Sequence, residues 1–238
     1  SGKTTTLYSG LRHISDTSQN ILTVEDPIEY TLPGIGQTQV NNKAGYDFAS
    51  GLRSILRQDP DIVMVGEIRD IETAKIAIQA SLTGHLVLST IHTNSAIGAI
   101  ARLRDMGIES YLLSSSLRVV IAQRLVRRLC EDCKTPIKPS AKIQEEFQLD
   151  KNDTIYQAIG CANCNDIGFK GRIALAECIT ISDELKALIH DEASEAQLIE
   201  SAFKDNLSLD LSSSQLLHDG LTSYEELLRV QNYQDANL

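Results

Sequence analysis

The chain has 238 residues, of which 42% are hydrophobic and 23% charged, enough for one large globular domain or one medium and one small domain. No apolar run approaches the ~20 residues that a membrane span needs, and no signal peptide heads the sequence. Residues 1–140 carry 15 Lys and Arg against 14 Asp and Glu, and residues 141–238 carry 7 against 18. Neither part is basic enough to favour generic nucleic-acid binding.

The first five residues match the last half of the phosphate-binding motif G-x-x-x-x-G-K-[ST]. In this motif, backbone N–H groups at a helix N-terminus cradle phosphates, the lysine neutralises the β and γ oxygens, and the following hydroxyl coordinates Mg²⁺. A plain helix start rich in small residues is the alternative, and a chain that begins inside a motif is expected to be a fragment. The matching residues are Ser1, Gly2, Lys3, Thr4 and Thr5, with Lys3 and Thr4 in the phosphate and magnesium roles.

Three carboxylates follow the apolar residues 21–24, which predict a buried strand. Glu25 and Asp26 stand at the strand's carboxyl end, Pro27 ends the strand, and Glu29 comes shortly after. Acids in this position can orient Mg²⁺ or a water molecule for attack, although a charged surface turn would look the same.

Residues 62–65 form an unbroken apolar run that predicts a strand buried on both faces of a parallel sheet. Glu67 follows directly, and ligands of open α/β sheets bind outside the carboxyl ends of the strands. Residues 86–88 predict another buried strand, with His92 among hydroxyl and amide side chains after it. His92 is therefore a candidate sensor of the γ-phosphate, whereas His85, in a strand, is by itself more typical of a structural histidine.

Alternating strands and helices with buried runs predict an α/β fold, a mostly parallel sheet with crossover helices. A short strand over residues 36–40 and a strand before Ser1 would complete the sheet. The expected helices follow the phosphate-binding residues and cover residues 48–56, 71–81, 96–106 and 111–129. The last of these contains four arginines and no acid over residues 118–128, and we expect it to face solvent or a neighbouring subunit.

Two C-x-x-C pairs lie 27 residues apart, a pattern typical of a structural zinc site with four thiolates. Four sulfur ligands leave no open position for catalysis. Redox disulfides are the main alternative, but a cytosolic protein would keep such cysteines reduced. A fifth cysteine, Cys178, is expected to be a buried free thiol. The proposed ligands are Cys130, Cys133, Cys161 and Cys164.

Small helices are expected beyond residue 181, with an N-terminal capping box at residues 222–226. This part offers no catalytic constellation. The sequence therefore divides into an ATPase-like domain over residues 1–129, a cysteine module over residues 130–170 and a helical subdomain over residues 171–238.

Four segments in order resemble the secretion-superfamily ATPases, the hexameric motors of type II secretion and type IV pilus assembly. Residues 2–5 resemble their Walker A box, and residues 21–30 (ILTVEDPIEY) their Asp box. Residues 57–70 (RQDPDIVMVGEIRD) resemble the Walker B box, and residues 83–94 (TGHLVLSTIHTN) the His box. The cysteine pairs are similar to the metal-binding element of the secretion and pilus-assembly branch, which retraction ATPases typically lack. The amino-acid sequences of residues 21–30, 34–41 and 101–108 resemble the type II secretion ATPases more than the pilus-assembly ATPases.

The resemblance implies a RecA-like ATPase with ATP, Mg²⁺ and Zn²⁺ as cofactors, in a cytoplasmic homohexamer that drives pseudopilus assembly. It carries His85 and His92 over as functional residues, and it leaves the general base open among Glu25, Glu29 and Glu67. Partners at the inner-membrane platform would bind through N-terminal domains that this sequence does not contain, and no nucleic-acid partner is implied. In residues 171–174 an alanine, Ala174, stands where the family usually has glycine.

Three other assignments fit parts of the sequence. A pilus-assembly ATPase shares every motif, and a DNA-stimulated RecA-like motor is disfavoured by the neutral first part of the chain. A scaffold without hydrolytic activity would not need acids beside a phosphate-binding loop.

Overall fold

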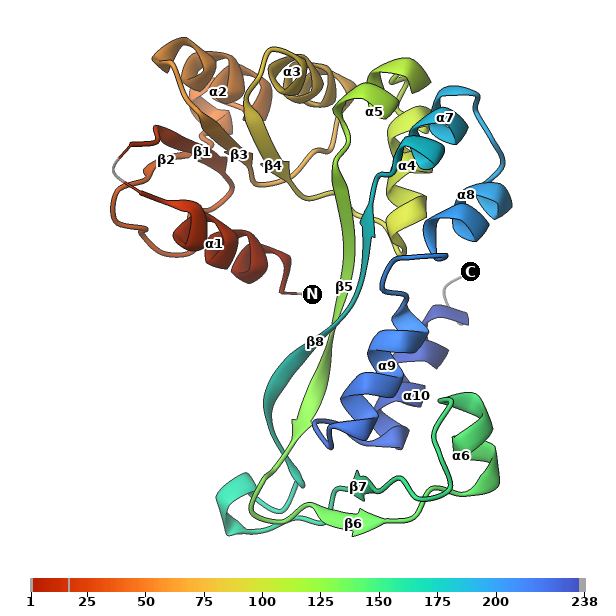
Figure 1. Cartoon of the computed structure of the whole chain (residues 1–238). Coiled ribbons are helices and arrows are strands. Elements are labelled where there is room, and N and C mark those ends of the chain that lie inside the picture. The colour runs from red at the N-terminus through yellow and green to blue at the C-terminus, as the bar shows by residue number, and fades with distance from the viewer. Residues whose placement is uncertain (1, 17, 236–238) are drawn as a thin grey trace. The chain divides into compact units, whose positions relative to one another are not determined.

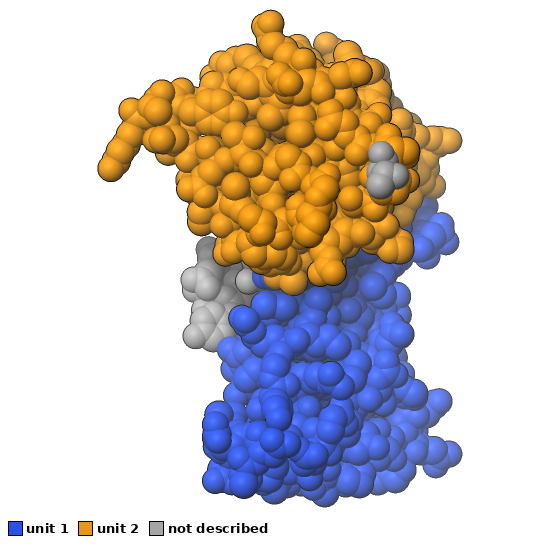
Figure 2. Space-filling view, turned by 90° about the vertical axis from the view of Figure 1, so that its left-hand side faces the viewer, with its two compact units in different colours: residues 1–2, 121–179, 203–238 blue, residues 3–120, 180–202 orange. Residues whose placement is uncertain are grey.

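The structure, a computed structural model, describes residues 2–16 and 18–235 and divides them into two compact units. One unit contains Lys3–Val120 and Thr180–Ala202, and the other contains Ile121–Ile179 and the residues from Phe203 onward, together with Gly2. Figure 2 shows the two units in different colours. Ser1 and the strand expected before it lie outside the described residues.

The first unit is built on a parallel sheet of four strands in the order β2-β1-β3-β4. The register pairs Val24 of β1 with Val65 of β3, and Val65 in turn with Ser89 of β4, so the three strands end at one edge. The strands are β1 (Ile21–Glu25), β2 (Gly36–Gln39), β3 (Ile62–Val65) and β4 (Leu86–Ser89).

Helices cover both faces of this sheet (Figure 1). Alternate residues of β3 supply the two cores: Ile62 and Met64 pack with α1 (Lys3–Ile14), and Val63 and Val65 pack with α2 (Phe48–Ile55). The helix α3 (Ile71–Leu82) adds Ala77 to the second core. Burial on both faces explains why β3 is apolar throughout, because neither side of the strand meets water.

The strand β4 departs from the expectation of a fully buried run. Leu86 is 46% exposed, and Val87 and Leu88 are half-buried. The cause is the position of β4, which is the last strand at one side of the described sheet.

Four further helices complete the first unit: α4 (Ala96–Asp105), α5 (Ser110–Ser116), α7 (Asp183–His190) and α8 (Glu195–Ala202). Arg104 of α4 donates hydrogen bonds to the carbonyl oxygens of Ile189, at 2.8 Å, and Ala193, at 3.3 Å. A cation at the last carbonyls of α7 satisfies acceptors that have no partner within the helix.

The prediction of one helix over residues 111–129 is wrong. Only α5 is helical there, and residues 119–129 form the strand β5 (Val119–Leu129), which pairs with β8 (Phe169–Thr180). The four arginines of residues 118–128 therefore lie on or next to a strand. Alternate residues of a strand lie on opposite faces, so Arg127 lies on the other face from Arg124 and Arg128. The arginines therefore do not share one face, as they were expected to do on a helix.

The second unit packs small elements around the β5–β8 pair. An antiparallel pair, β6 (Thr135–Ile137) with β7 (Ile155–Gln157), lies beyond β5 in the sequence. The remaining helices are α6 (Ala141–Glu146), α9 (Leu209–His218) and α10 (Tyr224–Asp235). Their shared core contains Val126, Ile155, Leu175, Leu217 and Leu227, all nearly fully buried.

The expected fold class is confirmed: a parallel α/β sheet with helices on both faces, a cluster of four cysteines and C-terminal helices. The division at residues 129 and 170 stays a prediction. Within the described part of the chain, no helix is both long and apolar enough to cross a membrane.

Candidate functional site

The carboxyl ends of β1, β3 and β4 carry the polar residues that the sequence singled out. Beyond the strands, Gly66 N–H donates to the carbonyl of Val24 at 2.8 Å, and Ile68 N–H donates to the carbonyl of Thr90 at 2.9 Å. The Thr90 hydroxyl donates to the carbonyl of Gly66 at 2.8 Å. These bonds hold the segments after β3 and β4 side by side, which fixes the positions of Glu67 and His92.

Lys3 begins α1 and reaches the end of β4. Its Nζ donates to the carbonyl oxygen of Ile91 at 3.4 Å, next to His92 in the sequence. Burial lowers the pKa of Lys3 from its ordinary value, and the nearby carboxylate of Glu67 opposes that shift. Thr4 is half-buried and Thr5 exposed in the same first turn, and Gly2 has φ of +76°, which favours glycine. Ser1 lies outside the described residues.

Glu67 lies at the centre of this group. Its Oε1 is 2.5 Å from Nη2 of Arg69, and its Oε2 is 3.3 Å from Nε2 of His92. The Glu67 side chain is 11% exposed, whereas those of Arg69 and His92 are 66% and 73% exposed. Oε2 is buried and accepts no hydrogen bond from any described residue. An acceptor in that state fits a water molecule or a metal-bound water near Lys3.

The other two candidate acids differ from Glu67. Glu25 is buried, and both of its oxygens accept hydrogen bonds: Oε1 from Thr23 at 2.5 Å and Gln37 at 3.0 Å, and Oε2 from Tyr8. Glu29 is exposed, and its backbone N–H donates to the Tyr8 hydroxyl at 3.3 Å. Of the three acids, Glu67 is the one that has a buried oxygen without a hydrogen-bond donor among the described residues.

The two histidines lie at opposite ends of β4. His92 follows the strand and joins Glu67, whereas His85 precedes the strand. The Nδ1 atom of His85 is 2.9 Å from the carbonyl oxygen of Ala80 and 3.2 Å from the hydroxyl of Thr83. The structure therefore brings His92 together with Glu67, and places His85 at the end of α3.

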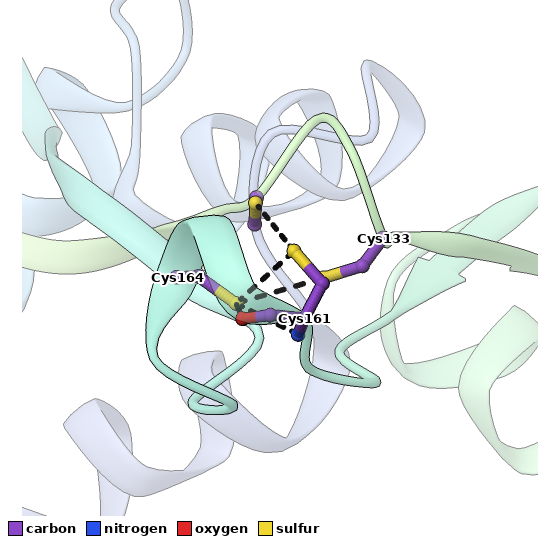
Figure 3. A group of neighbouring side chains, drawn as sticks. Cys133, Cys161 and Cys164 are labelled. Carbon is purple, nitrogen blue, oxygen red and sulfur yellow. Dashed lines mark hydrogen bonds between the residues drawn. The ribbon is translucent and has the colours of Figure 1, made fainter.

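The four cysteines of the two C-x-x-C pairs form one cluster, although 31 residues separate the first cysteines of the two pairs. All four sulfurs lie within 4.8 Å of one another. Figure 3 shows Cys133, Cys161 and Cys164 with their sulfurs turned toward one another. Sγ–Sγ distances are 4.0 Å from Cys130 to Cys161 and 3.8 Å from Cys133 to Cys164 and from Cys161 to Cys164. A tetrahedral site with Zn–S bonds of about 2.3 Å places its sulfurs about 3.8 Å apart. The cluster has the size of such a site.

Backbone donors surround one of these sulfurs. The N–H groups of Cys161 and Gly168 each lie 3.2 Å from Sγ of Cys164. Burial opposes ionisation of Cys164, but these donors outweigh it and lower its pKa to about 7. The donor set therefore fits a thiolate-bound metal. Cys178 is half-buried in β8, outside the cluster, which corrects the expectation of full burial.

Two residues near the acids were missed by the reasoning from sequence. Arg69 forms an ion pair with Glu67, and nothing in the sequence of residues 57–70 indicates that the two side chains meet. Tyr8 is fully buried in α1 and touches Glu25, a contact that no sequence spacing predicts. Asp70 has a structural role in the same motif, because its carboxylate caps α3 by accepting from Thr73 N–H at 2.8 Å.

Comparison with known proteins identifies the family and agrees with the fold. Residues 1–229 match the model of the family described as Type II/IV secretion system protein. The type II secretion system ATPase E of Vibrio cholerae is 53% identical over 97% of this chain and 46% of its own length. The type II secretion system protein E of Pseudomonas aeruginosa is 55% identical, with the same coverage of 97% and 46%.

Solved structures show the same architecture. The pilus retraction motor PilT with bound ADP has a TM-score of 0.72 and 30% identity, over 96% of this chain and 57% of that one. The ATPase DotB of Legionella pneumophila has a TM-score of 0.69 at 22% identity, over 97% of this chain and 57% of that one, and shares the fold alone.

The fold is that of an α/β secretion-system protein. The chain belongs to the Type II/IV secretion system protein family. It spans about half the length of the curated relatives that it matches.

Proposed function

We propose that this chain is the ATP-hydrolysing part of a motor that powers type II protein secretion. The observation that carries the proposal is the convergence of three side chains at one edge of the parallel sheet: Lys3 from the start of α1, Glu67 from the segment after β3 and His92 from the segment after β4. Phosphoryl transfer to water uses cations that neutralise the phosphates and a group that orients the water, roles that an ammonium and a shielded carboxylate can fill. An imidazole beside them can donate or accept a proton.

In the proposed site, the N-terminus of α1 and Lys3 bind the phosphates, since backbone N–H groups and a cation both favour anions there. Thr4 would hold Mg²⁺, which neutralises charge on the phosphates when it is bound. Glu67 orients the attacking water through Oε2, the oxygen that accepts no hydrogen bond from the described residues. His92 contacts the same oxygen and would link the state of the phosphates to movement of the chain after β4.

The cysteine cluster is proposed to bind one structural Zn²⁺ through Cys130, Cys133, Cys161 and Cys164. The sulfur distances and the N–H donors to Cys164 support this assignment. With all four positions taken by sulfur, the metal would stabilise its unit and take no part in hydrolysis.

The proposed assembly is a cytoplasmic homohexamer that is peripheral to the inner membrane through platform proteins and drives the pseudopilus. The named relatives in type II secretion support the assignment. The native mass of the full-length protein, with and without ATP, tests the hexamer. Restoration of secretion in a bacterial strain that lacks the gene tests the pathway, with a Lys3→Ala variant as the inactive control.

A pilus-assembly motor is the second candidate, because a pilus motor shares the fold at 30% identity. Complementation separates the two candidates. A gene that restores pili but leaves secretion defective would assign the chain to pilus assembly.

A further inference from the structure

Tyr8 lies in the phosphate-binding helix and is hydrogen-bonded to an acid of the neighbouring strand. It is fully buried on α1, five residues after Lys3, and its hydroxyl donates to Oε2 of Glu25 at the end of β1. Burial and this hydrogen bond raise the pKa of Tyr8 to about 12, so the hydroxyl stays a neutral donor near pH 7. Tyr8 also accepts the backbone N–H of Glu29 at 3.3 Å.

Gln37 of β2 completes the network from the other side. Its Nε2 donates to Oε1 of Glu25 at 3.0 Å and to the carbonyl of Tyr30 at 3.2 Å, and its Oε1 accepts from Leu32 N–H at 2.6 Å. The network thus connects α1, the end of β1, the turn after it and β2. A buried polar network in which each group has partners holds its members in one arrangement.

Glu25 adjoins the site that Glu67 belongs to. A Cβ atom built on Gly66, the residue before Glu67, would lie 3.4 Å from the Cα of Glu25. Movement of Glu25 would therefore disturb the segment that carries Glu67. Because Tyr8 and Lys3 share one helix, the network fixes this acid relative to the phosphate-binding residues.

We propose that Tyr8, supported by Gln37, is a positioning residue for ATP hydrolysis: it holds Glu25 and the turn that carries Glu29 in register with the phosphate-binding helix. The inference rests on the proposed ATPase function. A positioning residue acts on the chemical step, so its loss lowers kcat more than it raises KM.

The test compares full-length wild-type protein with Tyr8→Phe, which removes one hydroxyl and keeps the ring. We expect kcat for ATP to fall by about tenfold and KM to stay within about twofold. The matched control is Tyr111→Phe: Tyr111 is 54% exposed on α5, outside the network, so this variant also loses one phenol hydroxyl but leaves Glu25 and its donors unchanged. The control should turn over ATP like the wild type.

A kcat for Tyr8→Phe within twofold of the wild type would overturn the inference while leaving the ATPase proposal intact. A wild type without ATP turnover would instead overturn the proposed function. If Tyr8→Phe does not fold, as judged by its melting curve, Gln37→Met tests the same network, because it removes another of the three side-chain donors to Glu25. Wild-type kcat in a folded Gln37→Met protein would then contradict the positioning role, and a selective loss of kcat would support it.

Discussion

Glu67 and His92 face each other beyond the ends of two neighbouring strands, with Oε2 of the carboxylate 3.3 Å from Nε2 of the imidazole. The carboxylate is shielded and the imidazole is mostly exposed. This pair places an acid close enough to Lys3, the proposed phosphate-binding residue, to act on its charge, and an exposed imidazole beside that acid. It therefore predicts distinct roles for the two side chains.

Replacing Glu67 by glutamine should abolish hydrolysis and spare nucleotide binding. The substitution keeps the size of the side chain but removes the charge that orients water, so we expect turnover to fall by about 100-fold or more. Binding of a fluorescent ATP analogue and the melting temperature should stay close to wild type. Glu72→Gln is the control, because Glu72 is an exposed acid paired with Arg53 on the helices outside the site. Wild-type turnover in Glu67→Gln would remove this residue from the mechanism.

Alanine variants of the two histidines should differ in ATP turnover and in stability. His92→Ala removes an exposed ring that contacts Glu67, so turnover should fall severalfold while the melting temperature stays unchanged. His85→Ala removes a half-buried ring bonded to the end of α3, so the free energy of unfolding should fall by about 1 kcal/mol. An unaltered rate in His92→Ala would contradict the proposed contact with the reacting groups.

The cysteine cluster predicts metal-dependent stability. The double variant Cys130→Ser, Cys133→Ser should lose its zinc, which we expect at about one per chain in the wild type, and should melt at lower temperature because metal binding contributes folding energy. Cys178→Ser, outside the cluster, is the matched control and should keep its zinc. Elemental analysis and thermal melting measure both effects. A wild type that contains no zinc, and that melts like the double variant, would refute the assignment.

A buried carboxylate paired with two partly exposed arginines predicts acid sensitivity of the second unit. The Glu226 side chain is fully buried and accepts hydrogen bonds from Arg127 of β5 and Arg229 of α10. Burial opposes its ionisation, but the donors from Arg229 and Arg127 outweigh burial and lower the pKa of Glu226 to about 2. Between the ordinary value of 4.5 and about 2, the unfolded chain binds the proton more readily than the folded one. The contribution of Glu226 is therefore complete above pH 4.5 and is lost as the pH falls toward 2.

Glu226→Gln tests this contribution. At pH 7 it should lower the free energy of unfolding by about 2 kcal/mol, because two arginines lose their carboxylate partner. The difference from wild type should shrink as the pH falls below 4.5. Glu225→Gln changes the same charge on the exposed neighbour and should have little effect. Denaturant unfolding at pH 7 and pH 3 measures these differences, and a constant difference at both values would refute the account.

The sequence predicted features that depend on short-range patterns. The run at residues 62–65 is apolar because both faces of β3 are covered, so the strand could be recognised locally. The ligand spacing of the two cysteine pairs likewise predicted a cluster that the folded chain forms from distant segments.

Features that depend on distant partners were missed. Residues 119–129 contain Leu, Arg, Ala and Gln, which favour a helix locally, but pairing with β8, some 50 residues later, makes them a strand. The contact of Tyr8 with Glu25 joins a helix to a strand and leaves no periodic signal in the sequence. The sequence left the general base open among Glu25, Glu29 and Glu67. The reason to propose Glu67 comes from the hydrogen-bond partners of these acids, which the sequence does not show.

Lys3 and the strand-end acids are the residues proposed to hydrolyse ATP. The most direct measurement is ATP turnover by the full-length protein and by its Lys3→Ala variant, with melting temperature measured on both. Lys3 is half-buried at the start of α1, so its loss should reduce turnover by about 100-fold or more without unfolding the protein. Equal turnover in a folded Lys3→Ala protein, or no turnover in a hexameric wild type supplied with its membrane partners, would contradict the account.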